Sequence, residues 1–351
     1  MNATVAPPLY TVQDGEALRD RDTVLSIWHG NLGEEARLAG KYDWFYLGNP
    51  GEAPLLQLLR HEPSGAMVGV CSAGRRRMRL LGRDIRAGVL VDLAVTPEHR
   101  SLGPALILQQ GLIIAGQREL DLLYGFPNPK AAPVFKRIGY HQLTDIVRYA
   151  RVLRHTGYLA RRMPRALARP LGAVLDVAVH WRDVMRGRRG RRLHAEWSDR
   201  ADPRMDKLWS GSLHGDSLVA VRDAQHVRWR FDEAPLGHVR HLLLSESDDT
   251  LSAWFATQAV DGTLHVRDFW SLDAAHGIGT RYIDALLRAA RVAGHAAVSV
   301  EMAVPVPHLT AWLARGFVER GRRPVFGRWS IQPEGNAIDV ALHLTSADED
   351  E

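Results

Sequence analysis

Four landmarks occur twice along this 351-residue chain, in the same order and with similar spacing. Each set has an aromatic cluster before a turn, a β-type run, a glycine-containing loop and a closing glycine–aromatic pair. The matched segments are DWFYLGNPG with VRWRFDEAPLG, LVDLAV with VRDFWS, RSLGPA with AAHGIG, and FKRIGY with WLARGF. Two unrelated β-turn-α units are the alternative explanation. The shared order favours two copies of one α/β unit.

The composition is that of a globular protein with a large core. Hydrophobic residues make up 46% of the chain and charged residues 24%, and the length allows two domains. Cys71 is the single cysteine, so no intrachain disulfide can form. The N-terminal residues lack the pattern of a signal peptide, and no apolar run approaches the roughly 20 residues of a membrane-spanning helix. We expect a cytoplasmic protein.

The net charge of +5 is unevenly distributed. Thirteen arginines and two aspartates lie in residues 148–192, which therefore carry +11, while the rest of the chain sums to −6. We expect residues 154–192 to form an arginine-rich helical linker. Its basic face is either simply solvated or contacts an acidic carrier protein or an anionic membrane surface, which would make the protein peripheral to the inner membrane. No nucleic-acid partner is expected, because no aromatic-interleaved basic pattern accompanies the charge.

Residues 89–115 predict a strand, a turn and a helix. The run VLVDLAV is rich in branched residues, and the loop from Arg100 to Ala105 leads into a segment with helical spacing. Backbone N–H groups at a helix N-terminus have no intrahelical partner, and the helix dipole adds positive charge there. The loop is therefore a candidate anion site, although Gly103 could also serve a simple tight turn.

This loop resembles the Arg/Gln-x-x-Gly-x-Gly/Ala loop that holds the coenzyme A pyrophosphate in the GNAT (GCN5-related) N-acyltransferases. Residues 128–140, NPKAAPVFKRIGY, resemble the Asn-x-x-Ala-x-x-x-(Tyr/Phe)-x-x-x-Gly-(Phe/Tyr) motif of that family. The resemblance implies an α/β (α+β) protein with two GNAT-like domains, residues 1–153 and 193–345. Each would have a mixed, mostly antiparallel sheet flanked by helices. An acidic tail, residues 346–351, is expected to fray.

The resemblance implies that acetyl-CoA, or coenzyme A, is the cosubstrate and that the protein uses no metal. The amides of the loop would face the pyrophosphate, and the backbone of residues 93–95 would contact the pantetheine arm. The expected cofactor-binding residues are Leu93, Ala94, Val95, Arg100, Ser101, Leu102, Gly103, Ala105, Leu106, Asn128 and Phe135. Pro104 is an exception in this loop, because it has no backbone N–H to donate to the pyrophosphate. Asn128 could equally be a helix cap.

Acyl transfer to an amine needs a base, because an ammonium ion must lose a proton before it attacks. Asp92 lies where many members of the family carry an acidic residue, and it is a candidate base or water-holder. A structural ion pair or cap is the alternative for a carboxylate with such apolar neighbours. Phe135 stands where the family often has a tyrosine acid. Tyr124 and Tyr140 are substitutes for that acid, or else core aromatics.

The second copy of the motif is less complete. Ala274 replaces the arginine of the loop, and Asp268 parallels Asp92. We expect this half to shape the acceptor site or the interface. The resemblance implies an acyl-CoA-dependent N-acyltransferase that acylates a small-molecule amine or amino sugar by direct attack in a ternary complex. A transferase using an acyl carrier protein or aminoacyl-tRNA donor, and a non-catalytic GNAT-fold binding protein, are the alternatives.

Overall fold

The computed structural model describes residues 8–129, 131–155, 193–235, 237–247, 250–330 and 340–349, together with positions 174, 176, 177 and 181. Most of the predicted arginine-rich linker, residues 154–192, therefore lies outside the described residues. Across the described parts of the chain, no helix has the length and apolarity needed to cross a membrane.

The two halves repeat one order of elements. In each half an α-helix passes into a π-helix, and three antiparallel strands, a 3-10 turn, a long helix, a strand, a short helix and a final strand follow. The first half contains β1 (Tyr10–Gly15), α1 (Arg21–Trp28), α2 (Glu35–Tyr42), η1 (Asp43–Leu47), β2 (Leu55–His61), β3 (Met67–Leu80), β4 (Arg83–Val95), η2 (Pro97–His99), α3 (Leu102–Glu119), β5 (Leu122–Gly125), α4 (Ala132–Arg137) and β6 (His141–Val152).

The second half contains β7 (His194–Ser198), α7 (Arg204–Gly211), β8 (Leu218–Ala220), α8 (Ala224–Val227), η3 (Arg228–Asp232), β9 (Val239–Ser247), β10 (Thr250–Val260), β11 (Thr263–Ser271), η4 (Ala274–His276), α9 (Thr280–Val292), β12 (Ala297–Ala303), η5 (Val306–Leu309), α10 (Thr310–Ala314), β13 (Val318–Trp329), β14 (Leu342–Thr345) and η7 (Ser346–Asp348). The order of elements agrees with the internal repeat that the sequence predicts.

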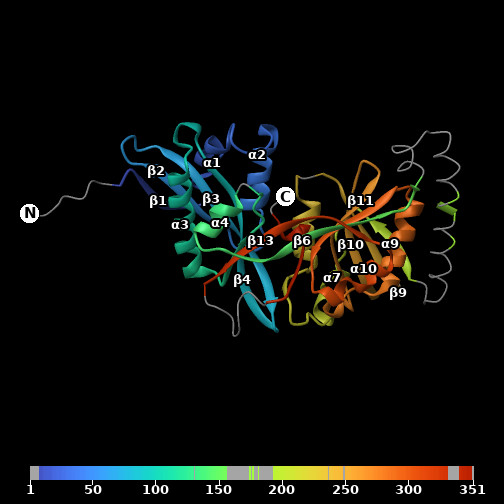
Figure 1. Cartoon of the computed structure of the whole chain (residues 1–351). Coiled ribbons are helices and arrows are strands. Elements are labelled where there is room, and N and C mark those ends of the chain that lie inside the picture. The colour runs from blue at the N-terminus through green and yellow to red at the C-terminus, as the bar shows by residue number, and fades with distance from the viewer. Residues whose placement is uncertain are drawn as a thin grey trace, which may run out of the picture.

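The strands of both halves form one continuous sheet, which corrects the expectation of a separate sheet in each half. β13 of the second half pairs with β5 and β6 of the first, and β6 in turn pairs with β12 of the second. Each half thus contributes its last long strand to the sheet of the other half. Figure 1 shows β13 and β6 crossing the middle of the molecule together. Local sequence patterns do not reveal this exchange, because they say nothing about which edge a strand joins.

The two π-helices meet where the halves touch. Trp44 of η1 stacks on Trp229 of η3 with ring centroids 5.3 Å apart. The indole N–H of Trp44 donates to the carbonyl of Trp229 at 2.6 Å, and that of Trp229 donates to the carbonyl of Trp44 at 3.1 Å. The reciprocal pair occupies corresponding positions in the two copies. The halves are therefore related by an approximate two-fold axis at this contact.

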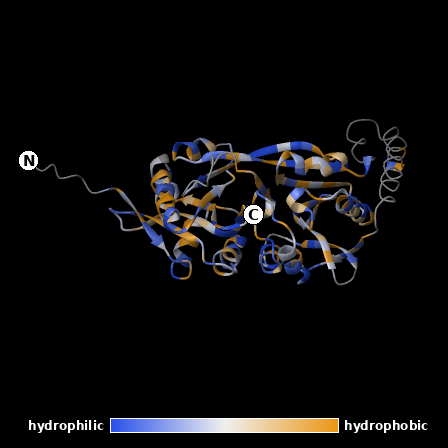
Figure 2. Cartoon of the chain, turned by 90° about the horizontal axis from the view of Figure 1, so that it is seen from below, coloured by the Kyte–Doolittle hydropathy of each residue, from blue (hydrophilic) through white to orange (hydrophobic). Residues whose placement is uncertain are grey.

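Helices cover both faces of the sheet in each half, so the core has four parts. In the first half α1 and α2 pack on one face and α3 on the other. In the second half α9 and α10 cover one face and α7 and α8 the other. Figure 2 shows hydrophobic residues concentrated inside both halves of the elongated molecule. One cluster also contains Trp229, Val325 and Leu342, so the core of the first half includes residues of the second.

The acidic tail is buried as far as residue 348, contrary to the expectation that residues 346–351 fray. Thr345 caps the short helix η7, and the Asp348 side chain accepts from the Thr345 backbone N–H at 2.8 Å. Asp348 is 1% exposed and bonds to Arg222 at 3.0 Å, while Glu349 bonds to Arg323 at 2.6 Å. The carboxylates are ordered because arginines far away in sequence compensate their charge.

Candidate active site

β4 contains a β-bulge close to its C-terminal end. Ala94 pairs with Val70 and Val91 pairs with Ser72, so Asp92 and Leu93 stand opposite the single residue Cys71. The backbone of Asp92 is left-handed, with φ +54°, a conformation that aspartate tolerates better than most residues. A bulge bends a strand and re-aims its side chains. The bulge interrupts the alternation of side chains between the two faces of the sheet along VLVDLAV. The face that Asp92 occupies therefore cannot be read from that alternation.

The carboxylate of Asp92 is held from two sides. Lys41 Nζ of α2 donates to its Oδ1 at 2.7 Å, and the Tyr46 hydroxyl of η1 lies 2.9 Å from its Oδ2. The same hydroxyl is 2.9 Å from Ser72 Oγ. A tyrosine has one proton and a carboxylate can only accept, so Tyr46 donates to Asp92 and accepts from Ser72. The Asp92 side chain is 4% exposed and that of Lys41 17%.

Tyr46 remains a neutral donor to Asp92. Its complete burial, followed by the negative charge of Asp92, raises the pKa of Tyr46 well above the usual value near 10. The phenol therefore keeps its proton across the physiological range and fixes the orientation of the carboxylate. Each carboxylate oxygen has two lone pairs, so a carboxylate can accept more than one hydrogen bond at each oxygen.

A cavity of about 380 Å³ adjoins Asp92. Its walls come from α1, from α2 with the turn before it, from the β4 bulge, and from the loop after η3 in the second half. The lining residues include Trp28, Glu34, Arg37, Lys41, Asp92, Leu93 and Pro235. Arg37 and Glu34 form an ion pair at 3.0 Å. The cavity thus combines apolar walls with paired charges, and Asp92 is accessible from it.

The β4–β5 ladder ends shortly before the bulge. Within the described residues their ladder joins Ala87–Val89 to Leu122–Tyr124 and goes no further, while β4 continues to Val95. Phe135 of α4 and Leu90 of β4 both approach Gly125, within 3.4 Å of the position that a Cβ would take. Phe135 therefore lies beside the end of the β4–β5 ladder. Leu93 is 37% exposed, whereas Ala94 and Val95 are buried.

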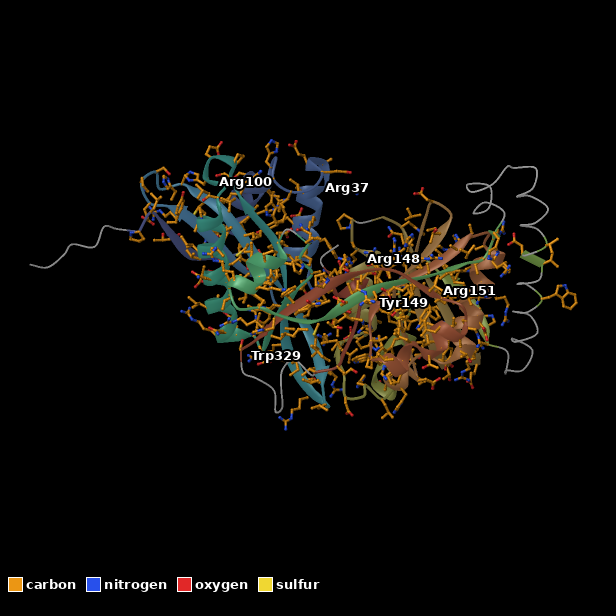
Figure 3. The ribbon with its side chains drawn as sticks, in the orientation of Figure 1. Arg37, Arg100, Arg148, Tyr149, Arg151 and Trp329 are labelled. Carbon is orange, nitrogen blue, oxygen red and sulfur yellow. The ribbon has the colours of Figure 1, made fainter. Side chains whose placement is uncertain are left out.

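The N-terminus of α3 is open. Ser101 is the exposed N-cap, Leu102 begins the helix, and Ala105 and Leu106 are half-buried in its first turns. Among the described residues, no atom outside the immediate chain lies within 4 Å of the position that a Cβ would occupy at Gly103. The backbone here is accessible to a ligand. Arg100 donates to the side chain of Asn31, at the end of the first half that also bears Arg37 (Figure 3).

The remaining candidate site residues, Asn128, Tyr124 and Tyr140, make contacts within the fold. The Asn128 side chain accepts from the Ala131 backbone N–H at 3.0 Å, as a helix cap does. Tyr124 donates to the carbonyl of Asp348 at 2.9 Å, and Tyr140 packs against Phe135 with ring centroids 5.2 Å apart. Burial raises the pKa of both tyrosines strongly. Neither tyrosine lines the cavity beside Asp92.

The corresponding site in the second half is closed. Asp268 is 1% exposed, and both its oxygens accept from Arg222 Nε, at 2.9 and 3.1 Å. Arg222 also donates to Asp348. At Gly277, φ is +94° and a Cβ would lie 2.7 Å from Cα of His308 in η5. A carboxylate oxygen of Asp273 is 2.9 Å from the position of a Cβ at Gly279.

Lys41 and Tyr46 were not found by sequence reasoning. Both lie about 50 residues before Asp92, and the only signal was the aromatic cluster around Trp44, which indicates a core as readily as a site. In the described part of the chain, no group of three or more His, Cys, Asp or Glu side chains could hold a metal ion.

Comparison of folds finds GCN5-related N-acetyltransferases. The proteins of that name from Anabaena variabilis ATCC 29413 and Kribbella flavida are 11% and 12% identical to this chain, with TM-scores of 0.62 and 0.60. The matches cover 92% and 91% of this chain, and 73% and 71% of theirs. A conserved protein of unknown function from Enterococcus faecalis V583 is 10% identical, with a TM-score of 0.63, over 92% of this chain and 73% of its own.

No protein-family model matches the sequence. No curated protein matches it either. The likeness is therefore one of fold, and the chain has the fold of the GCN5-related N-acetyltransferase superfamily.

Proposed function

We propose that this chain is an acyl-CoA-dependent N-acyltransferase whose active site lies in the first half. The donor is acetyl-CoA and the acceptor is a small-molecule amine or amino sugar. The observation that carries the proposal is the juxtaposition along β4. The strand passes the end of its ladder with β5, then the cavity at Asp92, and leads through η2 into the open N-terminus of α3.

The site proposed for acetyl-CoA rests on the accessible backbone at the start of α3. The amides of the first turn of α3 would hold the pyrophosphate, since Gly103 presents no side chain and the helix dipole favours an anion. Pro104 donates nothing, and the amides of residues 105 and 106 donate to carbonyls within α3, so the amides of residues 101–103 would carry this role. The pantetheine arm would enter where β4 leaves β5 and would hydrogen-bond to the backbone of residues 93–95, as an added strand does.

The acceptor amine would enter the cavity beside Asp92 and lose its proton to that carboxylate, directly or through a water. The free amine then attacks the thioester carbonyl and a C–N bond forms. The C–S bond breaks as the tetrahedral intermediate collapses, and the nitrogen loses its second proton to water or to the leaving thiolate. A backbone N–H at the bulge would stabilise the oxyanion. Because a thiol has a pKa near 8.5, the thiolate can take its proton from water without a tyrosine acid.

The test is acetyl-CoA turnover over a panel of amines, with coenzyme A binding measured by calorimetry. Gly103→Trp fills open space at the start of α3, so we expect a folded protein with coenzyme A binding reduced at least 100-fold. Gly211→Trp is the matched control, because Gly211 also lies in a helix and a Cβ there would meet nothing within 4 Å among the described residues.

The donor-site assignment is wrong if Gly103→Trp binds coenzyme A as tightly as the unmodified protein. If neither protein binds coenzyme A and no amine is acetylated, the transferase proposal itself fails. A carrier-protein donor would then be the next hypothesis to test.

A further inference from the structure

The two π-helices differ by one hydroxyl group at corresponding positions. The helices align on the reciprocal pair of Trp44 and Trp229. Two residues further on, Tyr46 of η1 corresponds to Phe231 of η3. Tyr46 bonds to Asp92, whereas a phenylalanine has no hydroxyl to donate. The phenol therefore occurs in the half whose aspartate borders a cavity, and a plain ring takes its place in the half whose aspartate is enclosed.

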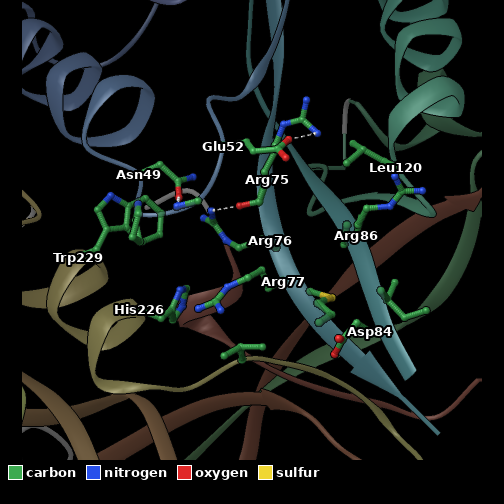
Figure 4. Close-up of a pocket in the computed structure, with 16 residues that line it drawn as sticks. Asn49, Glu52, Arg75, Arg76, Arg77, Asp84, Arg86, Leu120, His226 and Trp229 are labelled. Carbon is green, nitrogen blue, oxygen red and sulfur yellow. Dashed lines mark hydrogen bonds and ion pairs between the residues drawn. The ribbon is translucent and has the colours of Figure 1, made fainter. Parts of the chain in front are cut away.

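The second partner of Asp92 also has a different counterpart. By the same alignment Lys41 corresponds to His226, whose ring centroid lies 5.6 Å from that of Trp229. Figure 4 shows His226 and Trp229 on one helical segment that borders another cavity, which shares no lining residue with the cavity beside Asp92. The corresponding aspartate of the second half is bound by Arg222 instead. The arrangement around Asp92 thus belongs to the first half alone.

The ring of Tyr46 is fixed by two other aromatic side chains. It stacks on Tyr42 with ring centroids 4.5 Å apart, and it meets the ring of Trp28 edge to face at 5.5 Å. All three residues are at most 1% exposed. The Tyr42 hydroxyl donates to the carbonyl of Ala17 at 2.6 Å, so this neighbour is itself anchored. Because a close-packed interior leaves no room for a swing of the ring, the hydroxyl is held against Asp92.

The Tyr46 hydroxyl belongs to a short chain of hydrogen bonds. Ser72 of β3 is fully buried, its Oγ donates to Tyr46 at 2.9 Å, and Tyr46 donates to Asp92 at 2.9 Å. Hydrogen bonds that run in one direction polarise one another, so the bond from Ser72 strengthens the bond to Asp92. A hydrogen bond donated to a carboxylate stabilises the charged form over the protonated form. The chain therefore favours ionised Asp92, which is the form that a base needs.

We propose that Tyr46 is a positioning residue of the active site. Its hydroxyl, supported by Ser72, holds Asp92 in the orientation and in the ionised form needed to take a proton from the acceptor amine. Tyr46 is not among the residues that line the cavity, so it acts through Asp92 and not on the acceptor itself. This role rests on the proposed function, because it concerns the base of the same site.

The first test is the pH profile of acetyl-CoA turnover. Tyr46→Phe keeps the stacked ring and removes the hydroxyl, so the acid limb of the profile should move to higher pH by about one unit, and kcat at the optimum should fall about tenfold. KM for acetyl-CoA should stay the same, since the proposed donor site does not include Tyr46. Tyr42→Phe is the matched control. It removes the hydroxyl of the stacked neighbour, which bonds to Ala17, and should leave the profile in place.

The second test does not depend on turnover. The side-chain carboxyl of Asp92, assigned by its loss in Asp92→Asn, is titrated by carbon-13 NMR in the full chain. Its titration should move to higher pH by about one unit in Tyr46→Phe, by less in Ser72→Ala, and not at all in Tyr42→Phe. Ser72→Ala is the smaller change and decides the question if Tyr46→Phe does not fold.

The outcomes separate the two proposals. An unmoved carboxyl titration in a folded Tyr46→Phe or Ser72→Ala protein overturns the role of Tyr46, whether or not the chain acetylates an amine. An unmoved pH profile in Tyr46→Phe, or the same shift in Tyr42→Phe, overturns it as well. If the carboxyl responds as expected but the unmodified protein acetylates no amine, the proposed function fails, and the catalytic role of Tyr46 fails with it.

Discussion

The two halves of this molecule repeat one fold but treat the corresponding aspartate in opposite ways. Asp92 of the first half contacts Lys41 and Tyr46 and borders a cavity. Asp268 of the second half is buried in an ion pair with Arg222, which also bonds to Asp348 of the C-terminal segment. A repeated backbone can therefore leave a carboxylate beside a cavity in one copy and enclose it in a buried ion pair in the other.

The two glycine-containing loops differ in the same direction. The loop around Gly103 faces open space, whereas a Cβ at Gly277 would collide with η5. We therefore expect substitutions at these positions of the first half to lower turnover, and substitutions at the corresponding positions of the second half to lower the free energy of unfolding.

The largest effect is expected at Asp92. Asn tolerates the left-handed backbone at this position, so Asp92→Asn removes the negative charge with little strain. If Asp92 is the base, kcat should fall by about 10²–10⁴-fold. The measurement is acetyl-CoA turnover with the best amine. The corresponding change, Asp268→Asn, should leave coenzyme A affinity unaltered, and a kcat for Asp92→Asn close to that of the unmodified protein would remove Asp92 from the mechanism.

The next effect is on stability and concerns Asp268. Asp268→Asn leaves the buried Arg222 with one carboxylate partner fewer, and breaking a buried ion pair costs about 3–5 kcal/mol. Chemical denaturation should show this loss. Asp92→Asn should cost less, because Lys41 is partly exposed and can be solvated. Equal losses at the two positions would contradict the division of roles between the halves.

A pH dependence should come from two histidines of the second half. Burial, followed by neighbouring cations, holds the pKa of His226 and of His343 well below 6.5. Below pH 6.5 the unfolded chain therefore binds protons that the folded chain does not. The free energy of unfolding should fall with decreasing pH, by up to about 1.4 kcal/mol per pH unit for each histidine. Denaturant titrations between pH 7.5 and 5 measure this slope.

His343→Gln should make the slope shallower by the share of one histidine. His29→Gln, an exposed position in the first half, serves as the control and should leave the slope unchanged. A stability that is independent of pH below 6.5 would show that these histidines titrate normally in the folded protein.

The smallest effect tests the approximate symmetry. Trp44→Phe and Trp229→Phe each retain an aromatic ring and remove one interdomain hydrogen bond. Each should lower the free energy of unfolding by about 0.5–1.5 kcal/mol. Thermal unfolding of the two variants and of the double variant measures the coupling. A large loss of unfolding free energy from one variant and none from the other would mean that the contact is symmetric in geometry but not in energy.

Sequence reasoning described local structure better than long-range contacts. The repeat and the glycine loop depend on turns and periodicity within short windows, and the structure has a strand, turn and helix at residues 83–119. The contacts of Asp92 could not be predicted, because Lys41 and Tyr46 approach it through packing of α2 and η1. The tail was expected to be exposed because its composition is acidic, but Arg222 lies 126 residues before Asp348.

The crossing of β6 and β13 has a consequence for biosynthesis. The edge of β5 that receives β13 is made about 200 residues before its partner. At about 5–20 residues per second, a ribosome needs about 10–40 s to deliver that partner. During this interval a nascent chain presents an incomplete sheet edge, which is prone to pair with other chains. A gene fragment that ends after the first half would keep this edge permanently, so the first half should not be obtainable as a separate, well-behaved protein.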